Sequence, residues 1–219
     1  MRAALYWAPE VADPLHAAGS AWLGRDAETG ASLPLPDDRA AVTADARGYG
    51  LHATLKPPFR LAHGWNAFME DAHAFAARLA PFGLPPLAVM DLKGFLVLRE
   101  TAPCAALHAL ADAAVTELDA HRAPPPPEEL ARRRKPGLSP RQEAHLADWG
   151  YPYVLDEWRF HVTLTRRLDE EERPRWLAEA QAALAEAAGR PRVVREVCVF
   201  TQAAPGAPFL IAERLPLAG

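Results

Sequence analysis

Two copies of the pattern His-x-Thr-Leu stand half a chain apart in this sequence of 219 residues. The first is His52-Ala53-Thr54-Leu55 and the second is His161-Val162-Thr163-Leu164. On a β-strand, side chains two residues apart point to the same face, so each copy would present an imidazole beside a hydroxyl. On a helix this spacing does not bring the two side chains together. The pattern therefore predicts two strands whose histidines and threonines face one cleft.

Acid–base catalysis at phosphorus is the chemistry that suits two such pairs. An imidazole has an ordinary pKa of about 6.5, so at neutral pH one ring can be neutral while the other is protonated. His52 and His161 are the catalytic candidates, one to activate water and the other to protonate the leaving oxygen. The hydroxyls of Thr54 and Thr163 would donate to phosphate oxygens where charge develops. The sequence leaves open which histidine is the base, and the scheme requires no metal and no cofactor.

Alternation along the two motif strands would place further polar side chains on the same faces. Lys56 and Arg159 are expected to bind phosphate, because cationic donors make charge-assisted hydrogen bonds; a surface position is the alternative for Lys56. Other possible substrate-binding residues are Tyr6, Tyr49, Tyr153, Thr165 and Arg167. For any single tyrosine, core packing with a polar tip is the alternative interpretation. The basic run 132–135 is interpreted as a solvated helix end in preference to a substrate or nucleic-acid patch.

Composition narrows the class of protein. Half of the residues are hydrophobic and 24% are charged, as is typical of soluble globular proteins. The formal net charge of −4 argues against a long nucleic acid as partner. The two cysteines make neither a disulfide framework nor a zinc-finger spacing. No signal peptide or membrane span is evident, so we expect a cytoplasmic protein that binds a small phosphorylated substrate, with its oligomeric state left open.

Hydrophobic periodicity and capping residues outline the elements that must position the two motifs. Strands are expected at 3–7, from 52 to the Pro57-Pro58 pair, and at 87–92, 95–99, 157–168, 193–200 and 209–215. Helices are expected at 14–23, 65–79, 103–121, 140–149 and 169–188. Residues 25–47 are expected to form a long connection with one helical turn at 39–45. The two prolines should end regular strand pairing or confine it to a sheet edge.

The same order of elements, a helix followed by two strands, comes after each motif. That repetition predicts an internal duplication, although the halves have negligible identity outside the motifs. The expected fold class is α+β: a single bilobal domain over 1–219, pseudo-two-fold, with mainly antiparallel sheets lining a central cleft and helices outside. The lobes are expected at about 1–122 and 123–219, with exchange of elements between them allowed.

The paired motifs resemble the 2H phosphoesterase superfamily, which is named for two His-x-Thr/Ser motifs in a bilobal α+β fold. The segments 47–60 and 149–153 and the insert 129–134 resemble its DUF1045 subfamily, which is encoded beside phosphonate-degradation genes. This resemblance implies a metal-independent phosphodiesterase that opens a cyclic phosphate ester, in particular a small ribose cyclic phosphate in phosphonate catabolism. Two alternatives stay open: a 2′,3′-cyclic phosphodiesterase that processes RNA ends, and a non-catalytic protein that binds phosphorylated ligands.

Overall fold

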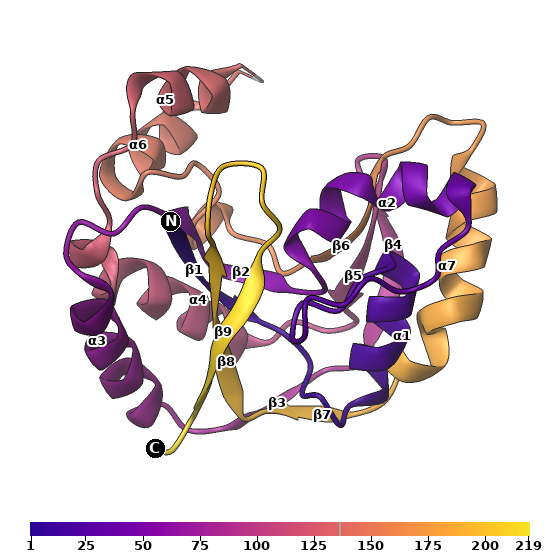
Figure 1. The fold of residues 1–219 in the computed structure, drawn as a ribbon, viewed down its shortest axis with the longest axis horizontal. Helices are drawn as coiled ribbons and strands as arrows, with labels where there is room; N and C mark the ends of the chain where they lie inside the picture. Colours follow the sequence, from indigo (N-terminus) through magenta and orange to yellow (C-terminus); the bar gives the residue numbers. More distant parts are fainter. Residues whose placement is uncertain (136) are drawn as a thin grey trace.

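One seven-stranded sheet forms the centre of the molecule, with the strand order β4-β5-β6-β2-β1-β8-β9 (Figure 1). The computed structural model describes residues 1–135 and 137–219. Every neighbouring pair in the sheet is antiparallel. The strands are β1 (Arg2–Trp7), β2 (Ala53–Phe59), β4 (Leu87–Leu92), β5 (Phe95–Glu100), β6 (Val162–Arg167), β8 (Glu196–Gln202) and β9 (Leu210–Pro216). A separate short pair joins β3 (Phe82–Leu84) to β7 (Arg192–Val194).

The helices gather around the two ends of this sheet (Figure 1). On the side of β4, β5 and β6 lie α1 (Pro14–Leu23), α2 (Asp37–Tyr49) and α7 (Arg173–Ala188). On the side of β1, β2 and β9 lie α3 (Trp65–Ala77) and α4 (Ala105–Glu117). The short helices α5 (Pro127–Arg134) and α6 (Pro140–Trp149) stand together beyond the sheet. Within the described residues, no helix has both the length and the apolar character needed to cross a bilayer.

The duplicated order of elements is visible along the chain, and the two halves exchange their last strands. The first half runs β2-α3-β3-β4-β5 and the second runs β6-α7-β7-β8-β9. Strand β5 of the first half pairs with β6 of the second, while β8 pairs with β1 beside β2. Helix α7 packs on β4, and α3 contacts β9. Each end of the sheet therefore contains strands from both halves of the chain. The expected α+β class with a mainly antiparallel sheet is confirmed.

The apolar residues of the motifs hold the motif strands in register. Ala53, Leu55, Val162 and Leu164 are all buried in the main hydrophobic core. A slip of one residue would turn these side chains to the cleft and the histidines into the core, so burial fixes which face each motif presents. The core thus decides that the imidazoles and hydroxyls face away from it.

Several local expectations are confirmed where the signal lies in a few adjacent residues. Helix α1 begins after Asp13, whose carboxylate accepts the N–H of Leu15, and ends at Gly24 in the left-handed conformation. Helix α6 begins with a reciprocal capping box between Ser139 and Gln142. These caps satisfy backbone groups that a helix end leaves unpaired.

Two expected element boundaries are wrong. The stretch 25–47 contains the whole N-terminal part of α2, a helix of 13 residues in which Val42 and Ala46 are among the few buried positions. Its helical period is therefore faint in the sequence. The second motif strand starts only at Val162, because residues 155–157 form a short 3₁₀ turn and Leu155 has a positive φ of 53°.

The proline pair does not end β2, which runs on to Phe59 and lies in the middle of the sheet. Two features of the strand pairing allow prolines at these positions. On one side, β6 pairs with β2 only at Ala53, so no neighbour requires their missing N–H groups. On the other side, the pairing with β1 shifts register between Lys56 and Phe59 and passes over Pro57 and Pro58.

Candidate active site

The two motifs meet at a single antiparallel bridge, where Ala53 of β2 pairs with Val162 of β6. This register sets His52 across from Thr163, and the second histidine across from the threonine of the first motif. The paired residues Ala53 and Val162 point into the core, so the four flanking side chains all point to the opposite face. The result is a two-by-two array with an approximate two-fold axis through the bridge.

The histidines occupy one diagonal of this array. Diagonal neighbours on antiparallel strands have side chains starting about 7 Å apart, which leaves room for a phosphoryl group between two imidazoles. The charge of His161 contributes to the pKa of His52, as expected for two rings within electrostatic range. Tryptophans hold both strands just past the bridge: the indole of Trp158 donates to the carbonyl of Thr54 at 2.8 Å, and that of Trp22 to Leu164 at 3.0 Å.

Each histidine ring is held by the backbone carbonyl two residues before it. The Nδ1 atom of His52 lies 2.9 Å from the carbonyl oxygen of Gly50, and Nδ1 of His161 lies 2.8 Å from that of Arg159. A carbonyl oxygen only accepts hydrogen bonds, so both Nδ1 atoms carry a hydrogen. The reactive nitrogen of each ring is therefore Nε2, which accepts a proton when the ring is neutral and donates one when it is charged.

The backbone conformation of Gly50 sets the position of the carbonyl that holds His52. Its φ of 80° and ψ of 177° belong to a region that is essentially restricted to glycine. A Cβ atom added there would lie 2.4 Å from the Cβ of Ala27. The amide of Gly50 donates back to Ala46 at 3.1 Å and so closes the end of α2. Helix α2 thus ends in a residue whose carbonyl is directed at the first catalytic candidate.

Two tyrosine rings stack on the imidazole of His52. The ring of Tyr6 stacks on it with centroids 4.0 Å apart, and the ring of Tyr49 stacks with centroids 5.7 Å apart. Tyr49 in turn stacks on Phe209 at 5.0 Å. Tyr6 is fully buried, whereas Tyr49 is 38% exposed. His52 therefore lies inside a stack that β1, the end of α2 and the segment before β9 build together.

Burial within this stack lowers the pKa of His52 to about 4. The hydrogen bond to the Gly50 carbonyl opposes this effect, and the charge of His161 adds to it. Loss of hydration disfavours the imidazolium form, so His52 is neutral near pH 7 and its Nε2 can accept a proton. His161 is partly exposed, and its ring stacks on no aromatic side chain of the described residues. Two motifs that are equivalent in sequence thus have unequal surroundings.

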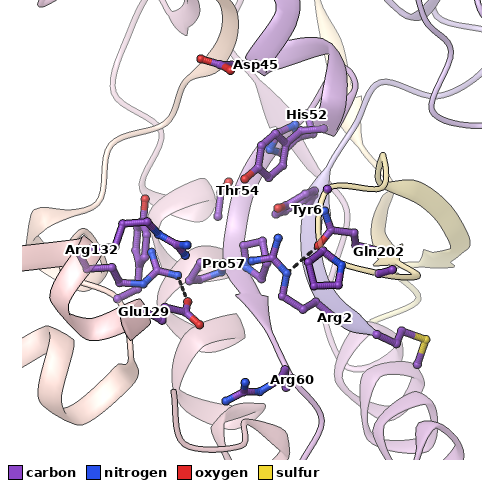
Figure 2. A pocket seen from close by; sticks show the side chains of 18 of the residues that line it. Arg2, Tyr6, Asp45, His52, Thr54, Pro57, Arg60, Glu129, Arg132 and Gln202 are labelled. Carbon is purple, nitrogen blue, oxygen red and sulfur yellow. Dashed lines mark hydrogen bonds and ion pairs between the residues drawn. The ribbon is translucent and has the colours of Figure 1, made fainter. Parts of the chain in front are cut away.

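A cavity of about 670 Å³ opens over the motif face (Figure 2). His52, Thr54 and Thr163 line it together with the rings of Tyr6 and Tyr49. His161, across from Thr54, is not one of the lining residues. The charged residues that line the cavity are Arg2, Asp45, Arg60, Glu128, Glu129, Arg132 and Arg133.

The chain matches a known protein family over most of its length. The family model described as "Protein of unknown function (DUF1045)" matches residues 54–210. The chain belongs to the DUF1045 family. The resemblance of the motif flanks to this family is thereby confirmed. The matched range begins at Thr54 and includes the whole second motif, while His52 stands just before it.

Two curated relatives match the DUF1045 chain over nearly all its length. It is 39% identical over 232 aligned positions to "Ribose 1,5-bisphosphate phosphokinase PhnN" of Janthinobacterium sp. (strain Marseille), with 100% of the chain and 51% of the relative covered. It is 41% identical over 219 positions to the protein of the same name from Laribacter hongkongensis (strain HLHK9), with 97% of the chain and 51% of the relative covered. The chain thus spans about half the length of the curated relatives it matches.

Among solved structures, the chain is similar to a crystal structure of a phosphoesterase, with a TM-score of 0.47 and 14% identity. That match covers 100% of this chain and 99% of the other. A crystal structure of E. coli LigT complexed with 3′-AMP also has a TM-score of 0.47, with 15% identity over 100% of this chain and 98% of the other.

Lys56 does not reach the cavity, so the expectation that it binds phosphate there is wrong. Strand β1 pairs Leu5 with Lys56 but Tyr6 with Thr54, which makes Leu55 an extra residue in a β-bulge. The bulge turns Lys56 away from the motif face, and only 2% of it is exposed. Its ammonium group instead donates to the carbonyl of Val115 and to the carboxylate of Asp119, each at 3.0 Å.

The equivalent position of the second motif is buried for the same reason. Pairing between β5 and β6 shifts register after Thr163, and Thr165 is fully buried. Its hydroxyl accepts the backbone N–H of Leu96 at 3.1 Å. The expectation that Thr165 contacts substrate is therefore wrong: in both motifs, a register shift interrupts the alternation immediately after the threonine.

Three other expected contacts lie away from the cavity lining. The guanidinium of Arg159 donates to the backbone carbonyls of Asp156 and Trp158, because this residue precedes the strand that was expected to carry it. Arg167 is exposed at the far end of β6. Tyr153 is 41% exposed and packs edge-on against Tyr151, which does line the cavity. Of the expected tyrosines, Tyr6 and Tyr49 are brought to the motifs and Tyr153 is not.

The sequence patterns missed the arginines of the cavity. Arg2 comes from β1 and Arg60 follows β2, while Arg132 and Arg133 come from α5. The interpretation of the basic run as a solvated helix end agrees with the exposure of Arg132, Arg134 and Lys135, although Arg132 also lines the cavity. Arg133 is half-buried and lines the cavity as well. Nothing in the local sequence signals that β1 and α5 face each other across the motifs.

Proposed function

We propose that this DUF1045 chain is a metal-independent phosphodiesterase that opens a small ribose cyclic phosphate, with His52 and His161 as its acid–base pair. One observation carries the proposal: the Ala53–Val162 bridge sets two imidazoles on one diagonal of a polar array. Each ring has Nδ1 bound to a carbonyl, and its Nε2 has no hydrogen-bond partner among the described residues. Two Nε2 atoms on either side of a phosphoryl group are the arrangement that in-line hydrolysis of an ester requires.

The unequal surroundings of the two rings favour His52 as the base. Its ring is neutral near pH 7 because burial lowers its pKa to about 4, so its Nε2 can take a proton from water. Two charged imidazoles so close together would repel each other, so the neutral His52 takes the role of base and leaves the role of acid to His161. His161, which is partly exposed, is then the acid, and it can exchange protons with solvent between turnovers.

The reaction balances as the addition of one water to the ester. As the water oxygen forms a bond to phosphorus, Nε2 of His52 takes a proton from that water. As the bond between phosphorus and the ribose oxygen breaks, Nε2–H of His161 gives its proton to the leaving oxygen. The product is a ribose phosphate monoester, and proton exchange with solvent restores both rings. Each proton transfer is expected to contribute on the order of 10²–10⁴ in rate.

The two threonines complete the array. Thr163 lies across from His52, and Thr54 lies across from His161, and both line the cavity. Their hydroxyls can donate to the non-bridging oxygens of the phosphoryl group, where negative charge increases as water adds. Donors fixed on paired strands need little reorganisation, which is the basis of electrostatic stabilisation of a transition state.

Ribose phosphates are favoured as the substrate class by the curated relatives, which are named for a kinase of ribose 1,5-bisphosphate. This chain has no G-x-x-x-x-G-K-[ST] sequence, the phosphate-binding loop typical of many ATP-dependent kinases. We therefore attribute the kinase name to the half of these relatives that the chain does not match. The cavity of about 670 Å³ suits a small ligand of sugar-phosphate size.

A hydrolysis assay with EDTA present tests the proposal. Ribose 1,2-cyclic phosphate and nucleoside 2′,3′-cyclic phosphates are followed by phosphorus NMR as the ring ester becomes a monoester. We expect turnover by the wild type and a loss of at least 100-fold in His52→Ala and in His161→Ala. His73→Ala is the matched control, since His73 is half exposed and pairs with Glu213 outside the cavity. Near-wild-type turnover by either motif variant would refute the proposal, and ligand binding without turnover would favour a binding protein.

A further inference from the structure

We infer that the cavity holds a second phosphate group of the substrate, bound between Arg2 and Arg132. The inference rests on the proposed function and makes it more specific: the substrate would be a ribose cyclic phosphate that carries a further phosphate monoester. Figure 2 shows Arg2 and Arg132 entering the cavity from opposite walls, with Pro57 between them and Thr54 on the side of His52.

Arg2 is held in position with part of its guanidinium left for a ligand. Its Nε donates to the side-chain oxygen of Gln202 at 2.8 Å, and its guanidinium carbon lies 5.5 Å from the ring centre of Phe209. Gln202 is buried, and its own amide donates to the carbonyl of Ala207 at 2.7 Å. An arginine fixed in this way loses little freedom on binding, so its terminal N–H groups are preorganised for an oxyanion.

Arg132 supplies the opposite wall from α5. It makes no ion pair with any described residue, whereas its neighbour Arg133 pairs with Glu129 at 2.6 Å and lies over the ring of Tyr151 at 4.7 Å. The contact with Tyr151 joins α5 to the segment after α6, whereas the pair with Glu129 lies within α5. Arg132 is exposed, and its guanidinium faces the space in front of Pro57 (Figure 2).

The carboxylates of the lining do not neutralise this pair of arginines. Asp45 lies beyond His52, at the other end of the cavity (Figure 2). Glu129 is occupied by Arg133. Glu128, four residues before Arg132 on the same helix, makes no ion pair with it among the described residues. Two cations directed at one partly enclosed space repel each other, and an anion between them removes that repulsion and accepts their hydrogen bonds.

The spacing suits the two ends of one sugar phosphate. Thr54 and Pro57 are three residues apart on β2, so at most about 10 Å of strand separates the motif threonine from the level of the arginines. A ribose with one phosphate at its ring ester and another on its exocyclic carbon places two anions at opposite ends of a single ring. The histidines would then act on the cyclic ester while the arginines hold the monoester.

Paired substrates separate this subsite from the catalytic array. We would measure kcat/KM on ribose 1,2-cyclic phosphate and on the same compound with a 5-phosphate, using wild type, Arg2→Gln and Arg132→Gln. Each variant is expected to lose roughly 10- to 100-fold on the 5-phosphorylated ester, the value of one charge-assisted hydrogen-bonding group, and less than about threefold on the other. Arg134→Gln is the control, because Arg134 is on the same helix but pairs with Glu143 outside the cavity.

Equal losses on both substrates would overturn the inference, since the arginines would then bind the cyclic phosphate itself. Losses on neither substrate would overturn it as well. Calorimetric binding of ribose 5-phosphate gives a readout that needs no turnover. We expect both variants to weaken that binding at least tenfold, and unchanged binding refutes the second subsite even if neither ester is hydrolysed. Failure of the proposed function gives a different result: neither ester would be hydrolysed, while ribose 5-phosphate would still bind in a way that depends on the two arginines.

Discussion

Replacing Tyr49 with alanine should raise the pKa of His52 and move the acid limb of the rate profile toward neutral pH. Burial is the largest cause of the lowering from 6.5 to about 4, a difference of about 2.5 pH units, or about 3 kcal/mol between the two protonation states. The ring of Tyr49 stacks on that of His52 with centroids 5.7 Å apart, and the ring of Tyr6 stacks on it with centroids 4.0 Å apart. Because the fully buried Tyr6 remains, we expect recovery of less than half of the difference, about one pH unit.

The direction of this effect follows from the role of His52 as a base. Only the neutral ring can accept a proton from water, so activity falls as pH drops through the pKa of His52 in the free enzyme. In the wild type this fall should begin well below pH 6, and in Tyr49→Ala it should begin about one pH unit higher. At pH 5 the variant should therefore lose activity that the wild type retains, while near pH 7.5 the two should differ less.

Two measurements check the prediction on the same samples. The pH dependence of kcat/KM gives the acid limb, and NMR titration of the His52 ring gives its pKa without substrate. Tyr153→Ala is the matched control, because Tyr153 is similarly exposed at 41% but lies outside the cavity. An acid limb that stays in place while the NMR pKa of His52 rises would show that another group is the base.

Three further predictions concern the framework of the site. Gly50→Ala should lower the free energy of unfolding by about 1–3 kcal/mol, measured by thermal unfolding, because only glycine suits the backbone conformation at this position. The same substitution should also lower kcat. Gly48→Ala is the control and should be neutral or stabilising, because the space around Gly48 is open. Lys56→Met should lower the unfolding free energy by about 2 kcal/mol and leave kcat within a few-fold of the wild type. Unchanged stability together with a large loss of kcat would instead indicate that Lys56 binds phosphate. Thr54→Val and Thr163→Val should each lower kcat by about 10- to 100-fold with little change in KM, and an unchanged kcat would exclude a transition-state role.

The sequence was sufficient for the parts of the site that depend on near neighbours. His52 and Thr54 share a face because they are two residues apart on a strand, and the core position of Leu55 fixes which face that is. The rule fails at Lys56 and Thr165, because the bulges that turn them inward arise from pairing with β1 and β5. A bulge is set by the partner strand, which the motif itself does not contain.

The unequal roles of the histidines also lay outside the reach of local patterns. Both motifs read alike, yet only the ring of His52 lies in an aromatic stack, since Tyr6 and Phe209 arrive from β1 and from the segment before β9. The same holds for the cavity arginines, because Arg2 comes from β1 and Arg132 from α5, and only the folded chain brings these elements to one cavity. Features of the site that depend on residue spacing can be predicted from the sequence, whereas features that depend on strand order are visible only in the folded protein.

An ester with a good leaving group tests the acid–base assignment most directly. A p-nitrophenyl phosphodiester releases a phenolate that needs no proton near neutral pH, so it removes the task assigned to His161 but keeps the task assigned to His52. We predict that His161→Ala, although inactive on ribose cyclic phosphates, regains a large part of wild-type activity on the p-nitrophenyl ester, while His52→Ala stays inactive on both. Rescue of His52→Ala instead of His161→Ala would contradict the assignment, and activity of both variants on the ribose ester would contradict the two-histidine mechanism itself.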